Sequence, residues 1–481
     1  MSPDRHAIVI GAGIAGLLAA RVLAESCTRV TILERDTGDV SAVRRGVPQG
    51  RHLHGLLDRG RGIMEDLYPG CTADLAAVGA HTAEVLVGTR WYIAGSRLTA
   101  TSTGLTSIIA TRPLLESVLR RRTLEFLNVE LREGITVRGL IGDGNRVTGV
   151  RLAPHRDGRP ALDDQTIGAP AESATPVDEF DEARHGRSRA ALSAEQVICA
   201  DLIVDASGRG SRIGEWLREI GAQSPAEEQL EVDLGYASRL YRHREGQLGG
   251  HASVIISTGP DGHGGGAVHV EGDRWLVTLA GMMGDHPPTD PAGFQAYAAT
   301  LSAPDIHEII TASEPLDDAV PYRFRASVRR RFDQQTAAPA GLIVLGDAQC
   351  AFNPLYAQGM TVAALQADAL RECLRAEGEF ADLPARFYTA ATEAAATAWQ
   401  LAAASDLRHP DVAGERTLLS RLTNAFVAQT QRAAHHDRRV ARTFMRVAHL
   451  VEPPAALAEP VLAGRIMLRG NGAAFARSAD R

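Results

Sequence analysis

Lysine is missing from this sequence, and cysteine is scarce. All 51 basic residues are arginine, so no lysine amine can form a Schiff base or relay a reactive group. The five cysteines are Cys27, Cys71, Cys199, Cys350 and Cys373. They form neither a CxxC pair nor a spacing typical of metal ligands. These absences exclude lysine-dependent chemistry and favour reduced thiols over a disulfide framework.

Long apolar runs and a strong net charge are also lacking. The sequence contains no uninterrupted stretch of about 18 apolar residues, the length that would cross a membrane. Its first apolar run, residues 7–10, leads into a glycine-rich turn and not into a signal-peptide cleavage site. The net charge of −7 gives no general attraction to nucleic acid or anionic lipid. We therefore expect a cytoplasmic protein with a small-molecule partner, no nucleic acid and no integral membrane association.

Apolar periodicity divides the 481 residues into strands and helices. Residues 7–10 predict a buried strand, 14–25 an alanine-rich helix and 29–33 a second strand, which together form a βαβ unit. Similar patterns predict strands at 147–152, 196–204 and 341–345, and helices at 113–126 and 361–374. The fold class is therefore α/β, built on a doubly wound sheet.

Other segments interrupt this sheet. Alternating patterns at 85–100 and 230–278 predict a largely antiparallel second sheet, with the glycine-rich stretch 259–266 as a loop between two strands. Residues 154–195 are polar and without periodicity, which indicates an exposed insertion. From residue 385 onward the sequence predicts helices, including 385–404 and 416–450.

A glycine fingerprint occupies the first predicted strand–helix junction. The string G-A-G-I-A-G gives a tight turn, a close approach to a pyrophosphate and close helix–sheet packing. Glu34 ends the next strand and can accept hydrogen bonds from ribose hydroxyls. Arg35 follows it, either as a ligand of a 2′-phosphate or adenine or as a solvated arginine. The predicted dinucleotide-binding residues here are Gly11, Gly13, Ala15, Gly16, Glu34 and Arg35.

Two later segments resemble the second and third fingerprints of flavoprotein hydroxylases of the para-hydroxybenzoate hydroxylase class. They are D-A-S-G-R-G-S (205–211), and L-G-D-A followed by N-P-L-Y-A-Q-G-M (345–360). The resemblance implies that Asp205 and Gly208 lie near the pyrophosphate of FAD, and that Gly346 and Asp347 bind its ribityl chain. For Asp205, the alternative is a turn held by an Asx hydrogen bond.

The resemblance implies further FAD contacts. A helix that begins near Gly359 would direct backbone N–H groups, including that of Met360, toward the flavin ring, with Pro354 beside it. Arg112 and Arg44 match cofactor-contacting arginines of the family, although either could be a solvated surface arginine and Arg45 competes with Arg44.

A narrower resemblance concerns the substrate. The string R-R-G-V-P-Q-G-R-H-L-H (44–54), together with the third fingerprint, is similar to bacterial flavin-dependent epoxidases of polyether biosynthesis, which are relatives of squalene epoxidase. Candidate substrate contacts are His52, His54, Phe352 and Tyr356. His52 and His54 are expected on one face of a strand, but no third ligand is nearby, so we predict no metal site.

Together these features predict a monooxygenase that transfers one oxygen atom from a flavin C4a-hydroperoxide to a hydrophobic substrate, by epoxidation or hydroxylation in polyketide or terpenoid metabolism. O2 is the second substrate, and NAD(P)H or a separate flavin reductase supplies electrons. No catalytic acid or base is assigned, because an isolated alkene needs none. Alternatives are an aromatic hydroxylase and an alkene reductase of the geranylgeranyl reductase type. A flavin halogenase is excluded by the missing lysine and the lack of a WxWxIP string.

The expected domain organisation follows from these assignments. We predict a Rossmann-type FAD-binding domain over 1–84, 104–225 and 336–376, an inserted, mostly antiparallel β-sheet substrate domain over 85–103 and 226–335, and a C-terminal helical region over 377–481.

Overall fold

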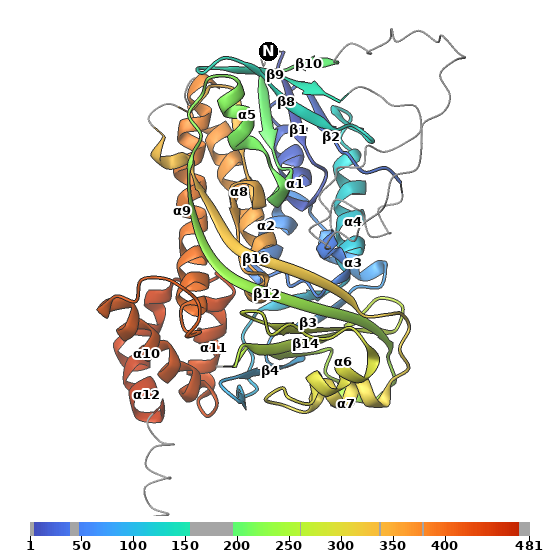
Figure 1. Ribbon diagram of the computed structural model, residues 1–481, viewed down its shortest axis with the longest axis vertical. Helices are drawn as coiled ribbons and strands as arrows, with labels where there is room; N and C mark the ends of the chain where they lie inside the picture. Colours follow the sequence, from blue (N-terminus) through green and yellow to red (C-terminus); the bar gives the residue numbers. More distant parts are fainter. Residues whose placement is uncertain are drawn as a thin grey trace, which may run out of the picture.

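The computed structural model describes residues 4–38, 48–153, 196–259, 261–335, 338–377 and 380–470 (Figure 1). Arg44, Arg45 and the predicted insertion 154–195 lie outside these residues. A five-stranded and an eight-stranded sheet form the main body, and the C-terminal helices lie along one side of it (Figure 1). None of the described helices combines the length and apolar character that crossing a membrane requires.

The five-stranded sheet is the predicted doubly wound sheet. Its strand order is β17-β11-β1-β2-β7, and all neighbouring strands are parallel. The central strands are apolar and almost wholly buried because other elements cover both faces. This arrangement confirms the predicted α/β fold class. The strands are β1 (His6–Ile10), β2 (Arg29–Leu33), β7 (Val129–Arg132), β11 (Leu202–Asp205) and β17 (Leu342–Val344).

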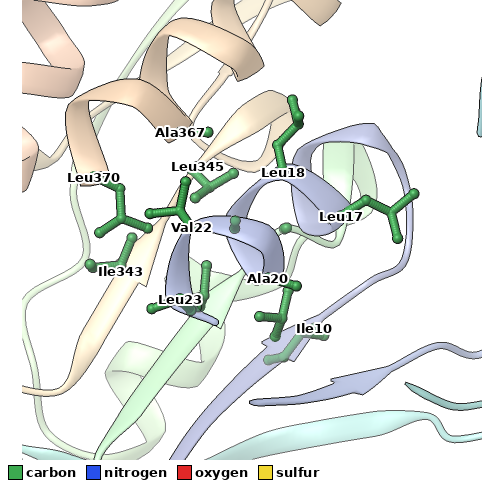
Figure 2. Close-up of a cluster of buried hydrophobic side chains, with 14 of the residues drawn as sticks. Ile10, Leu17, Leu18, Ala20, Val22, Leu23, Ile343, Leu345, Ala367 and Leu370 are labelled. Atoms are coloured by element: carbon green, nitrogen blue, oxygen red, sulfur yellow. The ribbon is translucent and has the colours of Figure 1, made fainter. Parts of the chain in front are cut away.

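Helix α1 (Ile14–Leu23) packs between this sheet and α8 (Gly359–Arg375). Leu18, Val22 and Leu23 are at most 1% exposed, and they lie among apolar side chains from β17 and α8 (Figure 2). Full burial of each such side chain contributes roughly 1.5–3 kcal/mol. The packing fixes where α1 and α8 begin relative to the strand ends. The other helices of this region are α2 (Asp58–Leu67), α3 (Cys71–Ala77), α4 (Arg112–Leu124) and α5 (Ile213–Glu219).

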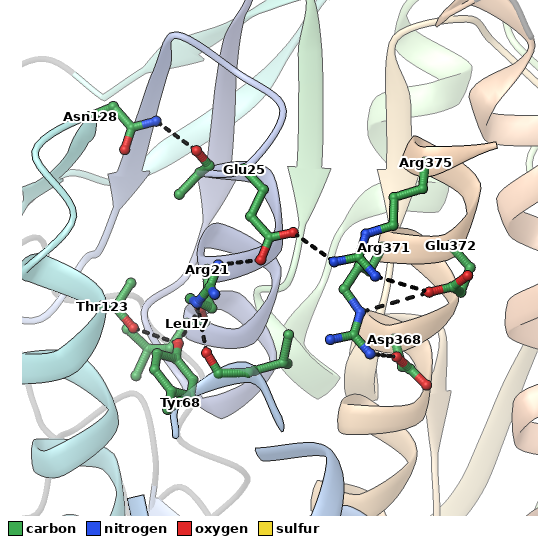
Figure 3. Close-up of polar contacts among 12 residues, drawn as sticks. Leu17, Arg21, Glu25, Tyr68, Thr123, Asn128, Asp368, Arg371, Glu372 and Arg375 are labelled. Atoms are coloured by element: carbon green, nitrogen blue, oxygen red, sulfur yellow. Dashed lines mark hydrogen bonds and ion pairs between the residues drawn. The ribbon is translucent and has the colours of Figure 1, made fainter. Parts of the chain in front are cut away.

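Polar contacts join α1 to its neighbours (Figure 3). The buried Tyr68 hydroxyl donates to the carbonyl oxygen of Leu17 (3.1 Å) and shares a 2.7 Å hydrogen bond with the Thr123 hydroxyl on α4. At the surface, Arg375 donates to Glu25 over 3.2 Å. Exposed ion pairs contribute only about 0–1 kcal/mol, so the Tyr68 network is the more important link.

The eight-stranded sheet is largely antiparallel. Its order is β18-β16-β12-β15-β14-β13-β4-β5, and only β13 and β4 run parallel. The long strands β12 and β16 extend from it toward the five-stranded sheet (Figure 1). Along this extension Arg329 and Arg331 of β16 pair with Glu228 of β12. The elements are β4 (Thr89–Ile93), β5 (Ser96–Arg97), β12 (Ala226–Arg242), β13 (Ser253–Ile256), β14 (His263–Val270), β15 (Arg274–Gly281), β16 (Val320–Arg331) and β18 (Cys350–Ala351), with α6 (Pro291–Ala298) and α7 (Asp305–Ala312) against one face.

The prediction that residues 259–266 form a loop is wrong at its C-terminal end, because Gly264, Gly265 and Gly266 belong to β14. The neighbouring strands explain these glycines. A Cβ on Gly265 would lie 2.8 Å from the carbonyl oxygen of Thr278, and a Cβ on Gly266 would lie 2.8 Å from a methyl carbon of Leu53. The glycines therefore allow other chain segments to approach this strand closely.

The C-terminal region is helical, as predicted, but the helix expected at 416–450 is two helices. Asp437 separates them, because its carboxylate accepts hydrogen bonds from the N–H groups of Arg439 (3.0 Å) and Val440 (3.3 Å) and caps a new helix. The division into three domains stays a prediction. The remaining elements are α9 (Leu383–Asp406), α10 (Leu418–Ala434), α11 (Arg438–Ala448), α12 (Pro460–Gly470), the paired strands β3 (His81–Glu84) and β6 (Thr106–Ile109), and the three-stranded sheet of β8 (Val137–Gly142), β9 (Val147–Leu152) and β10 (Val197–Cys199).

Candidate active site

The predicted cofactor residues gather at one edge of the five-stranded sheet. In the strand pairing, Ile10 lies opposite both Leu33 and Asp205, and Asp205 lies opposite Val344. The four parallel strands therefore end side by side, and the segments that follow them meet at the same edge. This is the edge at which open α/β sheets bind ligands. The fold thus brings together four segments that are far apart in the sequence.

The three glycines of the first fingerprint have different tasks. Gly11 adopts a φ of +97°, and its N–H donates to the carbonyl oxygen of Leu33 (2.8 Å). A Cβ on Gly16 would lie 1.9 Å from the carbonyl oxygen of Gly11, so α1 can approach the turn only with glycine there. A Cβ on Gly13 would have no neighbour closer than 4.0 Å. Gly13 therefore leaves open space at the positive end of α1, which suits a pyrophosphate.

Glu34 lies beside this turn. Its buried carboxylate accepts hydrogen bonds from the backbone N–H groups of Ala12 (2.8 Å) and Asp36 (3.0 Å), so it holds the turn in place. The Arg35 side chain is exposed. The location of Glu34 suits a ribose contact, and that contact stays a prediction.

Asp205 forms the Asx turn that the sequence left as an alternative. One carboxylate oxygen accepts from the N–H (3.0 Å) and hydroxyl (2.6 Å) of Ser207, and the other accepts from the Ser211 hydroxyl (2.5 Å). Asp205 is fully buried. In contrast, Gly208 has a φ of +79° and no atom within 4 Å of a Cβ built on it. Asp205 thus shapes the loop, and Gly208 is the residue of this fingerprint that could meet a ligand.

Asp347 offers a free acceptor at the same edge. Burial raises the pKa of its carboxyl group, while the charges of Arg112 and Arg209 oppose that effect. No hydrogen bond to this carboxylate occurs in the described part of the chain. Beside it, Gly346 has a φ of +65° and its N–H donates to the side-chain oxygen of Gln366 (2.6 Å). A carboxylate without a partner between two arginines fits the hydroxyl-bearing ribityl chain of FAD.

Helix α8 begins next to Asp347. A Cβ built on Gly359 would lie 3.6 Å from a carboxylate oxygen of Asp347. Within the described residues, the side-chain oxygen of Gln358 is buried without a hydrogen-bond partner, whereas the hydroxyl of Thr361 faces Gly60 of α2. The first N–H groups of a helix also lack intrahelical partners, and they carry partial positive charge. Buried polar atoms of this kind at a helix start fit the polar edge of a flavin ring.

His52 is anchored on the eight-stranded sheet. Its side chain is 2% exposed, and Nδ1 makes a 2.7 Å hydrogen bond with the Ser238 hydroxyl. Its ring centroid lies 5.1 Å from that of Tyr322 and 6.0 Å from that of Tyr236. His52 Nε2 is buried and has no partner among the described residues. An aromatic face with one unpaired polar atom is suited to recognise a mainly apolar substrate.

The expected strand at His52 and His54 is absent. Residues 52–55 are irregular, because hydrogen bonds to β12 and β15 hold them instead of a strand partner. The N–H of Leu53 donates to the Thr278 hydroxyl (3.0 Å), and His54 Nδ1 contacts the carbonyl oxygen of His52 (2.9 Å). The prediction that the two imidazoles lie on one face of a strand is therefore wrong.

The other two candidate substrate contacts lie before α8. The Tyr356 hydroxyl donates to Asp406 over 2.7 Å, and the side-chain amide of Asn353 donates to the same oxygen over 2.7 Å. Phe352 packs edge-on against Trp399, with centroids 6.1 Å apart. Burial raises the pKa of Asp406 to about 6. Its other oxygen is buried without a partner in the described residues.

Several residues of this region were not assigned from the sequence. Asp406 ends α9, and burial together with the nearby charge of Asp406 raises the pKa of the Tyr236 hydroxyl of β12, so this carboxylate lies near the sheet as well as the loop before α8. The Arg209 guanidinium lies over the rings of Tyr322 (5.3 Å) and Phe324 (4.9 Å). For Asp406 the sequence offers a local signal, an aspartate near the end of an alanine-rich helix, but its contacts depend on how the sheet and helices dock.

The buried histidines make the fold sensitive to acid. Burial lowers the pKa of His52 to about 4, of His54 to about 3 and of His449 to about 4. Unfolded histidines bind protons below pH 6.5, so the unfolded chain gains protons first and stability falls as the pH drops below that value. Each such histidine contributes a slope of up to about 1.4 kcal/mol per pH unit.

We expect the His52→Gln variant to lose less unfolding free energy than the parent when the pH falls from 7 to 5. Urea unfolding of the FAD-loaded enzyme at both pH values measures this difference. His307→Gln, on α7, serves as the matched control and should keep the parental slope. Equal slopes for His52→Gln and the parent would contradict the assigned burial of a neutral His52.

Comparisons with known proteins agree with this geometry. The squalene epoxidase family model matches residues 274–404, which include the third fingerprint and most of α9. Protein Rv3254 of Mycobacterium tuberculosis (strain ATCC 25618 / H37Rv) is 32% identical over 415 residues, 84% of this chain and 81% of that protein.

Solved structures share the fold. Flavin-dependent brominase Bmp2 matches with a TM-score of 0.62 and 14% identity, over 99% of this chain and 100% of that chain. The p-nitrophenol 4-monooxygenase PnpA from Pseudomonas putida DLL-E4 matches with a TM-score of 0.59 and 13% identity, over 94% and 100%. At these identities the similarity shows the fold alone. The match to the brominase is therefore no evidence that this chain is a halogenase.

The relative from M. tuberculosis covers most of both chains, and the family model covers the segment that holds Asp347, Tyr356 and α8. The fold, the glycine turn and the free acceptors at the sheet edge all fit FAD. The chain belongs to the FAD-dependent monooxygenases related to squalene epoxidase, enzymes that use FAD, an NAD(P)H-type electron donor and O2 to oxygenate a small molecule.

Proposed function

We propose that this enzyme inserts oxygen into a hydrophobic substrate of polyketide or terpenoid metabolism, preferably by epoxidation of an alkene. The observation that carries the proposal is the apolar surroundings of the loop before α8, where Phe352 packs with Trp399 and Leu355 with the cluster around Tyr236. An alkene attacks an electrophilic oxygen without help from an acid or base. The main tasks of such a site are to orient the substrate and exclude water.

The proposed FAD contacts follow the strand ends. Gly11, Gly13, Ala15 and Gly16 would border the pyrophosphate, with Gly208 on its other side and Asp205 shaping that loop. Glu34 and Arg35 would lie at the adenosine ribose, and Arg44, outside the described residues, remains a proposed pyrophosphate contact. Reduced FAD, when bound, supplies the chemistry of O2 activation.

At the flavin end, Arg112, Gly346 and Asp347 would hold the ribityl chain. Arg112 is positioned for this by α4, where its Nε donates to Glu116 over 2.9 Å and Thr111 caps the helix. Pro354, Gly359 and Met360 would meet the ring, with N–H groups at the start of α8 directed to its pyrimidine edge. His52, His54, Phe352 and Tyr356 are the proposed substrate contacts.

Hydroxylation of a phenol is the second candidate, and Asp406 favours it. A phenol becomes more reactive when a base takes its proton. The unpartnered oxygen of Asp406, in an acid whose pKa is raised to about 6, could accept that proton. Tyr356 donates to the other oxygen and would orient the carboxylate.

Two further points complete the proposal. We place the enzyme in the cytoplasm, as an extension of the sequence prediction. The fold has one nucleotide fingerprint at the sheet edge, so NAD(P)H would act transiently or a separate flavin reductase would deliver electrons.

The test is oxygen transfer from labelled O2 by the purified FAD-loaded enzyme. Farnesol, with isolated alkenes, and 2-naphthol, a phenol, are offered with NADH or NADPH, with and without a flavin reductase. We expect farnesol to gain one labelled oxygen, faster than 2-naphthol does. A faster reaction of 2-naphthol would favour the second candidate. A product with two added hydrogens and no label would identify an alkene reductase and overturn the proposal.

A further inference from the structure

Three residues that are far from the cofactor fingerprints in the sequence converge at one end of the eight-stranded sheet. His243 directly follows β12, His269 lies on β14, and Asp273 lies in the turn between β14 and β15. In the strand pairing Arg274 lies opposite both Arg242 and Val270, so the ends of the three neighbouring strands are aligned. This register places the two histidines beside the same turn.

The ligand atoms of these residues are already close together. One carboxylate oxygen of Asp273 lies 3.1 Å from His269 Nε2 and 3.5 Å from His243 Nδ1. One ligand atom from each of the three residues lies within 4.8 Å of the others. Four ligands at 2.0–2.1 Å from a tetrahedral ion are about 3.3 Å apart, because the angle between two bonds is near 109°. The two measured separations, 3.1 Å and 3.5 Å, lie on either side of this ligand–ligand distance.

The framework holds the histidines in this arrangement. The rings of His243 and His269 are stacked with centroids 3.8 Å apart and an interplanar angle of 11°, and His81 of β3 stacks on the other side of His269 at 4.1 Å. The backbone N–H of His243 donates to the carbonyl oxygen of Asp273 (3.0 Å). Because the lone pair of an imidazole nitrogen lies in the plane of its ring, one of the two stacked rings must rotate out of the stack before both histidines bind the same ion.

The surroundings leave the carboxylate available. The Asp273 side chain is 82% exposed, whereas those of His243 and His269 are 17% and 15% exposed. Arg274, next in sequence, is engaged by Glu271: its guanidinium forms an ion pair with the Glu271 carboxylate (3.4 Å), and its Nε donates to the Glu271 carbonyl oxygen (2.9 Å). An ion could thus enter from solvent between partly buried imidazoles and an exposed oxygen.

We propose that His243, His269 and Asp273 form a binding site for one divalent transition-metal ion of the Zn2+, Cu2+ or Ni2+ class. Two imidazoles and one carboxylate suit these ions, whereas Mg2+ and Ca2+ prefer oxygen ligands alone. A water molecule, or His81 after a ring rotation, completes the coordination. The ion would join the end of β12 to β14 and its turn, so it stabilises the folded sheet through mass action.

The test uses the FAD-loaded enzyme, prepared without a polyhistidine tag and treated with EDTA before dialysis. Zn2+ is titrated by calorimetry, and thermal unfolding is followed with and without Zn2+. We expect one bound Zn2+ per chain and a higher unfolding temperature. His243→Gln and Asp273→Asn should each weaken binding at least tenfold and remove the temperature shift. The control His307→Gln should bind as the parent does.

Electron paramagnetic resonance of bound Cu2+ supplies a second readout that does not depend on how well a variant folds at high temperature. Two coordinated nitrogens are expected in the parent, or three if His81 also binds, and one fewer in His243→Gln. Absence of stoichiometric Zn2+ binding, parental affinity in both variants, or a Cu2+ spectrum without nitrogen ligands would overturn the site. None of these results depends on oxygenase activity.

Discussion

Gly16→Ala is expected to disrupt the first strand–helix junction, whereas Gly13→Ala is expected to leave the fold intact and weaken FAD binding. The Cβ of an alanine at position 16 would lie 1.9 Å from the carbonyl oxygen of Gly11, a backbone atom that cannot move aside. A loss of about 4 kcal/mol or more of unfolding free energy is expected from such a clash. At position 13 the nearest atom would be a Glu116 oxygen at 4.0 Å, so the chain itself tolerates the methyl group.

The methyl group at position 13 would instead occupy the space proposed for the pyrophosphate. We expect at least tenfold weaker FAD binding from Gly13→Ala, about 1.4 kcal/mol or more, with unchanged circular dichroism of the FAD-free protein. The ratio of flavin absorbance to protein measures retention, and thermal unfolding measures the fold. Gly464→Ala on α12, where a Cβ meets no atom within 4 Å, is the neutral control. Full FAD retention by Gly13→Ala would place the cofactor elsewhere.

This pair of glycines shows what the sequence could predict. A strand, a turn and a helix within 25 residues encode the junction locally, so the glycine spacing in that context indicated the tasks of Gly11 and Gly16. The parallel sheet could also be predicted from the sequence, because strands that are buried on both faces appear as apolar runs. The third fingerprint led to Asp347 and α8 through its resemblance to that of flavoprotein hydroxylases. Each of these signals is contained within a short stretch of consecutive residues.

Residues whose positions depend on strand register were not found. His243, His269 and Asp273 converge only because β12, β15 and β14 are paired as they are, and no spacing in the sequence indicates this. The contact between Tyr356 and Asp406 requires α9 to end beside the loop before α8. The role of a polar residue within a motif was also ambiguous, since the Asp205 carboxylate accepts a hydrogen bond from the N–H of Ser207 and so stabilises the turn of its own loop.

Asp406→Asn is expected to stabilise the enzyme at neutral and alkaline pH. Burial raises the pKa of Asp406 from its ordinary value near 4 to about 6. Between these values the folded chain retains a proton that the unfolded chain has lost, so stability falls as the pH rises from about 4 to about 6 and stays reduced above it. Two pKa units correspond to roughly 3 kcal/mol. An asparagine avoids this cost, and its oxygen can still accept from Tyr356 and Asn353.

Urea unfolding of the FAD-loaded enzyme at pH 4.5 and pH 8 measures the effect. The variant should exceed the parent by roughly 2–3 kcal/mol at pH 8 and by only about 1 kcal/mol at pH 4.5, where the unfolded parent is already partly ionised. The control is Asp368→Asn, at a partly exposed residue of α8 that pairs with Arg371, and it should show no such gain. A variant that is less stable than the parent at pH 8 would mean that the charge of Asp406 is stabilised by its surroundings.

A stabilising substitution at this position would also bear on the chemistry. Sites that keep an ionisable group at a cost in stability commonly use it for function. If Asp406 accepts a proton from a phenolic substrate, Asp406→Asn should reduce labelled-oxygen transfer to 2-naphthol by about 10²-fold or more and leave transfer to farnesol within a few-fold. Equal losses with both compounds would instead assign Asp406 to holding Tyr356 and Asn353 in place, because a merely positional defect does not distinguish an alkene from a phenol.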